Sequence, residues 1–196
     1  MNIEPVVLRG DRVVMEPLSL DHVGPLCEFG FDEGIWRWTI NKINTEDQMR
    51  EYVESALRDR VKGVAVPFAT KLAEGYKIVG STRFGNIDVQ NRKAEIGWTW
   101  VGPAWQRSFV NTEAKLLMLT QAFEVWGCVR VELKTDALNE QSRNAILRLG
   151  AVEEGILRNH MITDDGRFRD TVYFSIIDTE WERVKAGLLQ KLRSYQ

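Results

Sequence analysis

A polar turn directly before a long helical pattern is the first place in this sequence where chemistry could reside. The turn runs from Gln106 to Asn111, between a strand pattern and a helical pattern that is expected from Thr112. The start of a helix carries N–H groups without backbone partners and a partial positive charge, which together suit a phosphate. Arg107 adds a planar cation for the same anion. On spacing alone the simpler interpretation is a polar connection capped by Asn111 or Thr112, and no Gly-x-Gly fingerprint of a nucleotide site is present.

Three further polar residues could carry chemistry, and each also has a structural interpretation. Asn139 opens a short helical pattern, where its residue type favours simple capping. His160 lies beside a predicted hairpin turn and could contact substrate or exchange a proton, although a structural or surface histidine is the simpler interpretation. Asp170 could attract a cationic amine, or it could pair internally with Arg158 or Arg169.

Composition excludes several classes of function. Of the 196 residues, 44% are apolar and 28% are charged, and the net charge of −2 leaves no broad basic field for nucleic acid or an anionic membrane. No apolar run approaches the roughly 20 residues of a membrane span, and the charged N-terminal stretch is no signal peptide. Two cysteines, two histidines and no metal-ligand spacing indicate a reduced, cytoplasmic protein without a metal site.

The order of elements predicts one mixed α/β domain over residues 1–196, with helices on the faces of a single sheet. Alternating and helical patterns predict a hairpin over 6–19, helices over 22–29 and after Thr45, strands over 65–72, 77–88 and 93–102, a helix over 112–126, a strand over 128–136, a helix over 139–150, a hairpin over 155–178 and a terminal helix over 179–192.

The strand over 93–102 precedes the polar turn and is expected to alternate regularly. Strict alternation would place three apolar residues on one face and three small or polar residues on the other. The first set is Ile96, Trp98 and Trp100, and the second is Glu95, Gly97 and Thr99.

Three stretches of the chain resemble the GCN5-related N-acetyltransferases, and in particular their RimJ/RimL-like branch. They are AEIGWTWVGPAWQRSFVNTEAKLLMLTQAFE, VELKTDALNEQSRNAILRLGAVEEG and RDTVYFSI, with weaker similarity in LRGDRVVMEPLSLDH near the N-terminus. The resemblance covers nearly the whole chain. It implies the acyl-CoA N-acyltransferase fold, an α/β (α+β) architecture with a mixed, mostly antiparallel sheet that is flanked by helices and splayed near Thr99.

The resemblance also implies an acetyl-coenzyme A site. The family's pyrophosphate loop, Gln/Arg-x-x-Gly-x-Gly/Ala, falls on the polar turn, where Phe109 and Asn111 replace the two small residues. Backbone groups of the preceding strand would bind the pantetheine arm. The implied coenzyme-binding residues are Thr99, Val101, Gln106, Arg107, Ser108, Phe109, Val110, Asn111, Thr112, Asn139, Ser142 and Arg143, the last of which could equally lie on a solvated helix face.

The chemistry implied by the resemblance is acetyl transfer to an amine, without a metal. Glu95 falls where some family members keep a base, although it could instead be a surface or salt-bridged glutamate. Ser142 becomes the candidate donor to the leaving thiolate, because Ile146 stands where many members have a tyrosine. The acceptor would meet Trp36 and Trp38, for which core packing is the alternative.

The sequence therefore predicts N-acetylation of a primary amine by direct attack, on a protein N-terminus or a small amine. His160 and Asp170 complete the expected acceptor-binding set with the two tryptophans. A coenzyme A-binding or ligand-sensing module without catalysis is the alternative, because the loop glycines and the tyrosine are replaced. The resemblance leaves room for a homodimer, and no nucleic-acid or membrane partner is expected.

Overall fold

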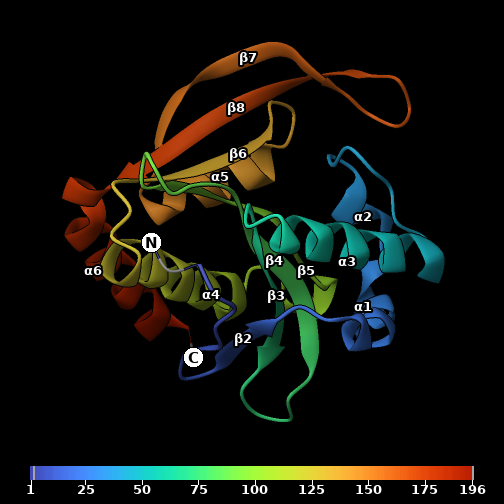
Figure 1. The fold of residues 1–196 in the computed structure, drawn as a ribbon, viewed down its shortest axis with the longest axis horizontal. Helices are drawn as coiled ribbons and strands as arrows, with labels where there is room; N and C mark the ends of the chain where they lie inside the picture. The colour runs from blue at the N-terminus through green and yellow to red at the C-terminus, as the bar shows by residue number, and fades with distance from the viewer. Residues whose placement is uncertain (2, 196) are drawn as a thin grey trace.

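In the part of the chain that the structure describes, eight strands form one sheet in the order β1-β2-β3-β4-β5-β6-β8-β7. The structure, a computed structural model, describes residues 1 and 3–195 (Figure 1). The strand bounds are β1 Leu8–Arg9, β2 Val13–Pro17, β3 Val66–Leu72, β4 Ile78–Asp88, β5 Lys93–Val101, β6 Arg130–Asp136, β7 Val152–Ile162 and β8 Phe168–Ile177. Neighbouring strands pair antiparallel except β5 and β6, which pair parallel. The predicted mixed, mostly antiparallel sheet with flanking helices is confirmed.

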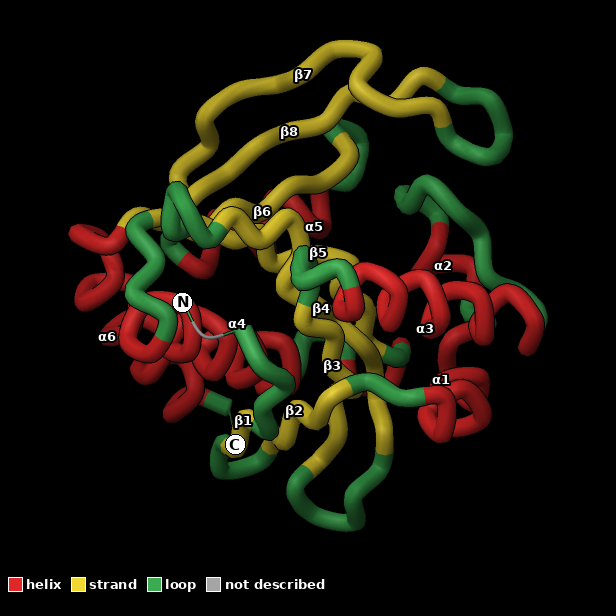
Figure 2. Tube along the Cα trace, in the orientation of Figure 1, coloured by secondary structure: helices red, strands yellow, loops and turns green. Residues whose placement is uncertain are grey.

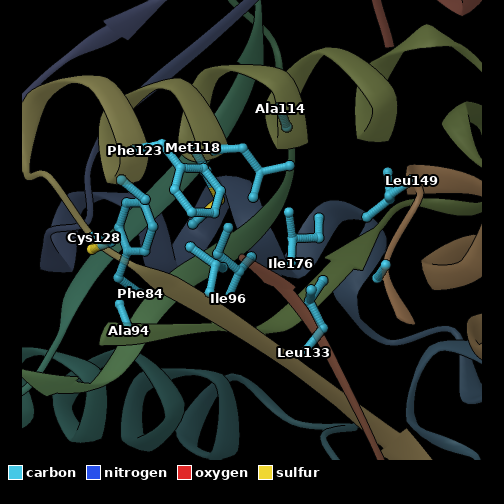
Figure 3. Packing of buried hydrophobic residues seen from close by; sticks show 14 of the residues in the cluster. Phe84, Ala94, Ile96, Ala114, Met118, Phe123, Cys128, Leu133, Leu149 and Ile176 are labelled. Atoms are coloured by element: carbon cyan, nitrogen blue, oxygen red, sulfur yellow. The ribbon is translucent and has the colours of Figure 1, made fainter. Parts of the chain in front are cut away.

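Among the described residues, six α-helices cover the two faces of the sheet (Figure 2). They are α1 Val23–Gly30, α2 Glu33–Trp36, α3 Glu46–Val61, α4 Phe109–Thr120, α5 Glu140–Leu149 and α6 Trp181–Ser194. The larger core lies between the sheet and α4, α5 and α6, where Met118, Phe84 and Ile96 meet (Figure 3). A smaller core lies under α1 and α3 on the opposite face and contains Trp36 and Trp100. No helix in the described part of the chain combines the length and apolar composition that a membrane crossing requires.

Several boundaries follow from local chemistry that the sequence displays. Thr45 accepts a hydrogen bond from the Gln48 N–H at 3.2 Å and starts α3, as predicted. Gly150 ends α5 in the left-handed conformation, with φ of 101°. Gly127 likewise has φ of 65° and ends the helical segment that follows α4, which closes through one wider turn over Gln121–Val125.

The start of α4 differs from the prediction by three residues. The helix begins at Phe109 rather than near Thr112, and Ser108 caps it by accepting from the Val110 N–H at 3.3 Å. The caps predicted at Asn111 or Thr112 are therefore wrong. Ser108 also donates to the Trp105 carbonyl at 2.6 Å, so a single hydroxyl fixes both the turn and the helix start.

The regular alternation predicted for β5 is also wrong, because the strand contains a bulge. The pairing with β4 shifts between Ser81 and Arg83, and Trp98 adopts the left-handed conformation with φ of 51°. Ile96 therefore faces the core under α4, whereas Trp100 faces the core under α3. Thr99 follows the bulge and turns toward α4, which regular alternation from Ile96 would not allow.

Candidate coenzyme and acceptor site

The sheet opens between β5 and β6. Their parallel pairing includes only Lys93–Arg130, Ala94–Val131 and Glu95–Glu132. Beyond Glu95 the two strands diverge, so the β5 edge that faces β6 has no strand partner up to Val101. Backbone polar groups need partners, and an unpaired strand edge offers them to an extended ligand. The splay predicted near Thr99 therefore begins just after Glu95.

The polar turn lies at the far end of this unpaired edge. Arg107 has φ of 60°, is exposed, and forms no ion pair with any residue that the structure describes. Gln106 donates its side-chain amide to the Val101 carbonyl at 3.1 Å and so ties the turn to the end of β5. The first turn of α4 follows, where backbone N–H groups lack helical acceptors. A free guanidinium beside a helix N-terminus fits a pyrophosphate.

The side chains in the first turn of α4 mostly pack into the protein. Val110 is fully buried, and the Phe109 ring packs under the Arg12 guanidinium, 4.2 Å from its centroid. The Asn111 Oδ1 is buried without a hydrogen-bond partner, and the Thr112 hydroxyl lies 3.2 Å from the Tyr195 hydroxyl. The Val110 N–H already donates to the Ser108 hydroxyl, so the first turn can offer an anion its remaining backbone N–H groups more readily than its side chains.

Arg12 and Glu113 fasten this turn to the first hairpin. The Arg12 N–H donates to the Glu113 Oε1 at 2.9 Å, and the Arg12 guanidinium donates to the carbonyls of Leu192 and Tyr195 after crossing Phe109. The hairpin, the start of α4 and the end of α6 are thus joined around one arginine. Phe109, which replaces the first small residue of the family's loop motif, therefore packs against Arg12.

Glu95 is a buried carboxylate with one oxygen committed and one available. Its Oε2 accepts from the Lys134 Nζ at 2.9 Å and from the Asn86 Nδ2 at 2.7 Å, while the residue is 3% exposed. No described residue donates to Oε1, which lies beside Gly97 at a place where a Cβ would come within 2.9 Å. Glu95 is thus salt-bridged, and its second oxygen, beside Gly97, has no partner among the described residues.

A row of polar side chains leads from Glu95 to the surface along one face of the sheet. Lys134 on β6 pairs with Glu95 and lies 5.7 Å from the Tyr173 ring on β8. The Tyr173 ring is 5.8 Å from the His160 ring on β7. His160 and Asp170 line an open hollow of about 840 Å³ together with Ile156, Leu157, Arg158 and Asn159.

Asp170 and the two tryptophans occupy different surroundings. Asp170 accepts from the Asn159 N–H at 2.7 Å and forms no ion pair with Arg158 or Arg169. Trp36 is 5% exposed, donates to the Gly30 carbonyl and belongs to the smaller core. Its alternative role in core packing is therefore the one that the structure shows. Trp38 is half-buried.

The rim of the site joins segments far apart in sequence. The Arg37 and Arg167 guanidinium groups lie 5.0 and 5.8 Å from the centroid of the Trp38 ring. Asp164, at the tip of the β7–β8 hairpin, donates its N–H to the Ile40 carbonyl at 3.1 Å. Figure 1 shows the hairpin arching from the far edge of the sheet toward α2. The hairpin tip is therefore held against the segment after α2.

The start of α5 lies on the other side of the sheet opening, directly after β6. Asn139 caps the helix by accepting from the Ser142 N–H at 3.0 Å. The Ser142 hydroxyl is half-exposed and has no partner among the described residues. Arg143 pairs with Glu153 at 3.2 Å, and Ile146 is buried. Asn139 therefore caps α5, and the Ser142 hydroxyl beside it stays available to a ligand.

Sequence reasoning missed Lys115, a buried lysine on α4. It is 4% exposed, and its Nζ lies 2.6 Å from the Thr99 Oγ1 and 3.4 Å from the Thr82 Oγ1. The available signal was its spacing, since Lys115 precedes the buried Leu119 by four residues and Met118 by three, and so falls within the apolar stripe. Lys134 and Asn86 were also missed, because only the sheet pairing brings them to Glu95.

Comparisons with known proteins agree with this geometry. Residues 12–152 match the Acetyltransferase (GNAT) domain. YdaF of Bacillus subtilis (strain 168), which carries the provisional name ribosomal N-acetyltransferase, is 31% identical over 152 residues, 78% of this chain and 81% of its own. The ribosomal-protein-serine acetyltransferase of Escherichia coli (strain K12) is 24% identical over 174 residues, 87% of this chain and 96% of its own.

Solved structures extend the likeness to the whole fold. A structure from T. thermophilus, described as an acetyltransferase, superposes with a TM-score of 0.88 at 33% identity and covers 98% of this chain and 100% of its own. Mycobacterium smegmatis RimJ, in complex with CoA-disulfide, has the same fold with a TM-score of 0.82 at 20% identity over 96% of each chain. The chain is therefore an acetyltransferase of the GNAT family, close to its RimJ/RimL-like members.

Proposed function

We propose that this enzyme transfers the acetyl group of acetyl-coenzyme A to the N-terminal amine of a protein, by direct attack. The observation that carries the proposal is the opening of the sheet beyond Glu95. It places an unpaired strand edge between a helix N-terminus with a free arginine and a buried carboxylate with a free oxygen. Two substrates could thus meet end to end in one gap, and holding them there supplies much of the rate of such a reaction.

The residues of the turn fit the phosphate end of the coenzyme. Arg107 and the N–H groups of the first turn of α4 would hold the pyrophosphate. The edge of β5 at Thr99 and Val101 would pair with the amides of the pantetheine arm. The Val101 carbonyl accepts from the Gln106 side chain, and it would have to give up that hydrogen bond to accept from the ligand. Asn139 caps α5 at the opposite wall and would face the same arm.

Two side chains would serve the proton transfers. The Glu95 Oε1 would take the proton that the attacking amine loses, directly or through water, while Lys134 and Asn86 hold the other oxygen in place. The Ser142 hydroxyl, which has no partner among the described residues, would donate to the departing thiolate. No covalent intermediate on the enzyme is needed.

The shape of the acceptor side favours a peptide over a small enclosed amine. The hollow at His160 and Asp170 is open to solvent, and the polar row through Lys134 and Tyr173 leads from it toward Glu95. An amine at Glu95 could therefore continue outward as a polypeptide along this row. The names of YdaF and the E. coli relative point to ribosomal proteins as the class to screen first.

The first experiment is calorimetric titration with acetyl-coenzyme A and with coenzyme A, followed by a transfer assay. Micromolar binding and acetylation of peptides at their N-terminal amine are expected, with Glu95→Gln lowering turnover more than tenfold. Acetylation of polyamines or amino acids in preference to peptides would overturn the acceptor assignment. Binding without transfer to any amine would leave only a coenzyme-binding role, and absence of binding would refute the proposal as a whole.

A further inference from the structure

Lys115 is a buried cationic side chain on the helix that follows the polar turn. Its Nζ lies 2.6 Å from the Thr99 Oγ1 and 3.4 Å from the Thr82 Oγ1, and the residue is 4% exposed. The Thr82 and Thr99 hydroxyls are 2.7 Å apart, so the three side chains form one network across α4, β4 and β5. A buried lysine is rare, because its charged form is costly to remove from water.

The β5 bulge creates this network. Because Trp98 takes the left-handed conformation, Thr99 turns toward α4 while its exposed side still borders the sheet opening. A threonine hydroxyl can accept from an ammonium and donate its own hydrogen elsewhere. The Thr82 hydroxyl can donate either to the Gly97 carbonyl at 3.2 Å or to the Thr99 oxygen at 2.7 Å. When Thr82 donates to Thr99, the Thr99 hydrogen has only the distant Gly97 carbonyl, at 3.5 Å, among the described residues, and it can donate into the opening instead.

No counter-charge accompanies Lys115 among the described residues. Glu113, on the same helix, bonds to the Arg12 N–H, and Glu95 and Arg83 lie on the opposite face of the sheet. Lys93, at the start of β5, lies 3.7 Å from Glu132. Burial alone lowers the pKa of Lys115 from 10.5 to about 7. The group is thus poised to gain charge if an anion forms nearby.

We propose that Lys115, acting through the Thr99 hydroxyl, is a positioning residue that stabilises negative charge on the coenzyme sulfur during acetyl transfer. The inference rests on the proposed function, which places the reactive end of the coenzyme between the turn at Arg107 and Glu95, alongside Thr99. The ammonium holds the Thr99 oxygen, and the Thr99 hydrogen points to the sulfur as the thioester bond breaks. Ser142, from the α5 side, remains the proton donor to the thiolate.

The direct test needs no acceptor amine. Plain coenzyme A bound to the protein is titrated with pH, and its thiolate is followed by ultraviolet absorbance. A cation and a hydroxyl donor near a thiol favour the thiolate, so the bound thiol of the natural protein should titrate below the free thiol. Lys115→Met should raise the midpoint by about one pH unit, which is a tenfold loss of thiolate at intermediate pH. An unchanged midpoint in this variant would refute the inference.

A second pair of variants keeps the test decisive if Lys115→Met loses its fold or its affinity. Thr99→Val removes the hydroxyl and should reproduce the raised midpoint, whereas Thr99→Ser should retain the natural value. Equal titration midpoints in Thr99→Val and Thr99→Ser would contradict the proposal that Lys115 acts through the Thr99 hydroxyl. Lys62→Met, at an exposed lysine directly after α3, is the charge-matched control and should leave the titration unchanged.

The transfer assay separates positioning from binding. Lys115→Met should lower kcat at least tenfold while KM for acetyl-coenzyme A stays within twofold, because the charge on sulfur develops only as the bond breaks. A loss confined to KM would mean a structural role alone. If the natural protein binds coenzyme A but transfers to no amine, the proposed function fails on its own while the thiolate titration still decides this inference.

Discussion

Replacing Lys115 by methionine should change how the stability of the protein depends on pH. Burial lowers the pKa of this lysine to about 7, whereas the unfolded chain should return it to 10.5. Between these values the unfolded state binds more protons than the folded state, so stability rises with pH across this window. Below pH 7 both states are protonated, and the full cost of burying the charge is present.

The magnitude follows from the two pKa values. The interval from 10.5 to about 7 corresponds to roughly 5 kcal/mol of destabilisation at low pH. The cost falls by about 2.7 kcal/mol between pH 6 and pH 9. Methionine removes this cost but also loses the hydrogen bonds to Thr99 and Thr82, at about 1 kcal/mol each. The variant should therefore be more stable by about 3 kcal/mol at pH 6 and nearly equal to the natural protein at pH 9.

Urea unfolding at pH 6, 7, 8 and 9 measures this difference directly. The upper limit avoids Cys128, because burial raises the pKa of that thiol from 9.0 to about 11 and makes stability fall as pH rises above 9. Lys62→Met serves as the exposed control and should track the natural protein at every pH. If the Lys115→Met and natural curves stay parallel from pH 6 to 9, Lys115 is charged in the folded state throughout and the reasoning is refuted.

Three other predictions concern the turn, the second helix start and the first hairpin. Arg107→Glu should weaken coenzyme A binding more than tenfold by calorimetry, whereas Arg148→Glu, at an exposed position of α5, should not. Equal affinities of the Arg107→Glu variant and the natural protein would remove Arg107 from the phosphate site. Ser142→Ala should lower turnover more than acetyl-coenzyme A affinity, and an unaltered rate would end its proposed donor role. Gly10→Ala should cost about 1–3 kcal/mol in urea unfolding, because the new Cβ would lie 2.1 Å from the Glu113 Oε1; unchanged stability would show that this carboxylate can move freely.

Local sequence chemistry accounts for most of the element boundaries. Thr45 and Asn139 cap their helices, Gly127 and Gly150 end theirs, and the turn at Gly10 joins the first two strands. These outcomes depend on interactions within a few residues, such as a side-chain oxygen that reaches a nearby N–H. For that reason residue type and spacing sufficed to predict them.

The errors at α4 and β5 both involve contacts between distant segments. Ser108 caps α4 locally, and the first turn is also held by Arg12, about a hundred residues away, which packs over the Phe109 ring and bonds through its own N–H to Glu113. The bulge at Trp98 depends on the register with β4, where Gly85 leaves space for the indole and Arg83 packs against it. The contacts with Arg12 and with β4 are not visible in the residues around the affected positions.

The sequence by itself determined the strands, the helices other than α2, the order of these elements and the presence of a polar turn before a helix. Those features arise from backbone propensities and hydrophobic periodicity, which act over one or two turns of chain. The tertiary structure alone decided where β5 leaves β6, which oxygen of Glu95 is free and that Lys115 is buried against Thr99. Those features depend on strand pairing and on packing between distant segments, because the energy of a buried charge is set by whatever the fold places around it.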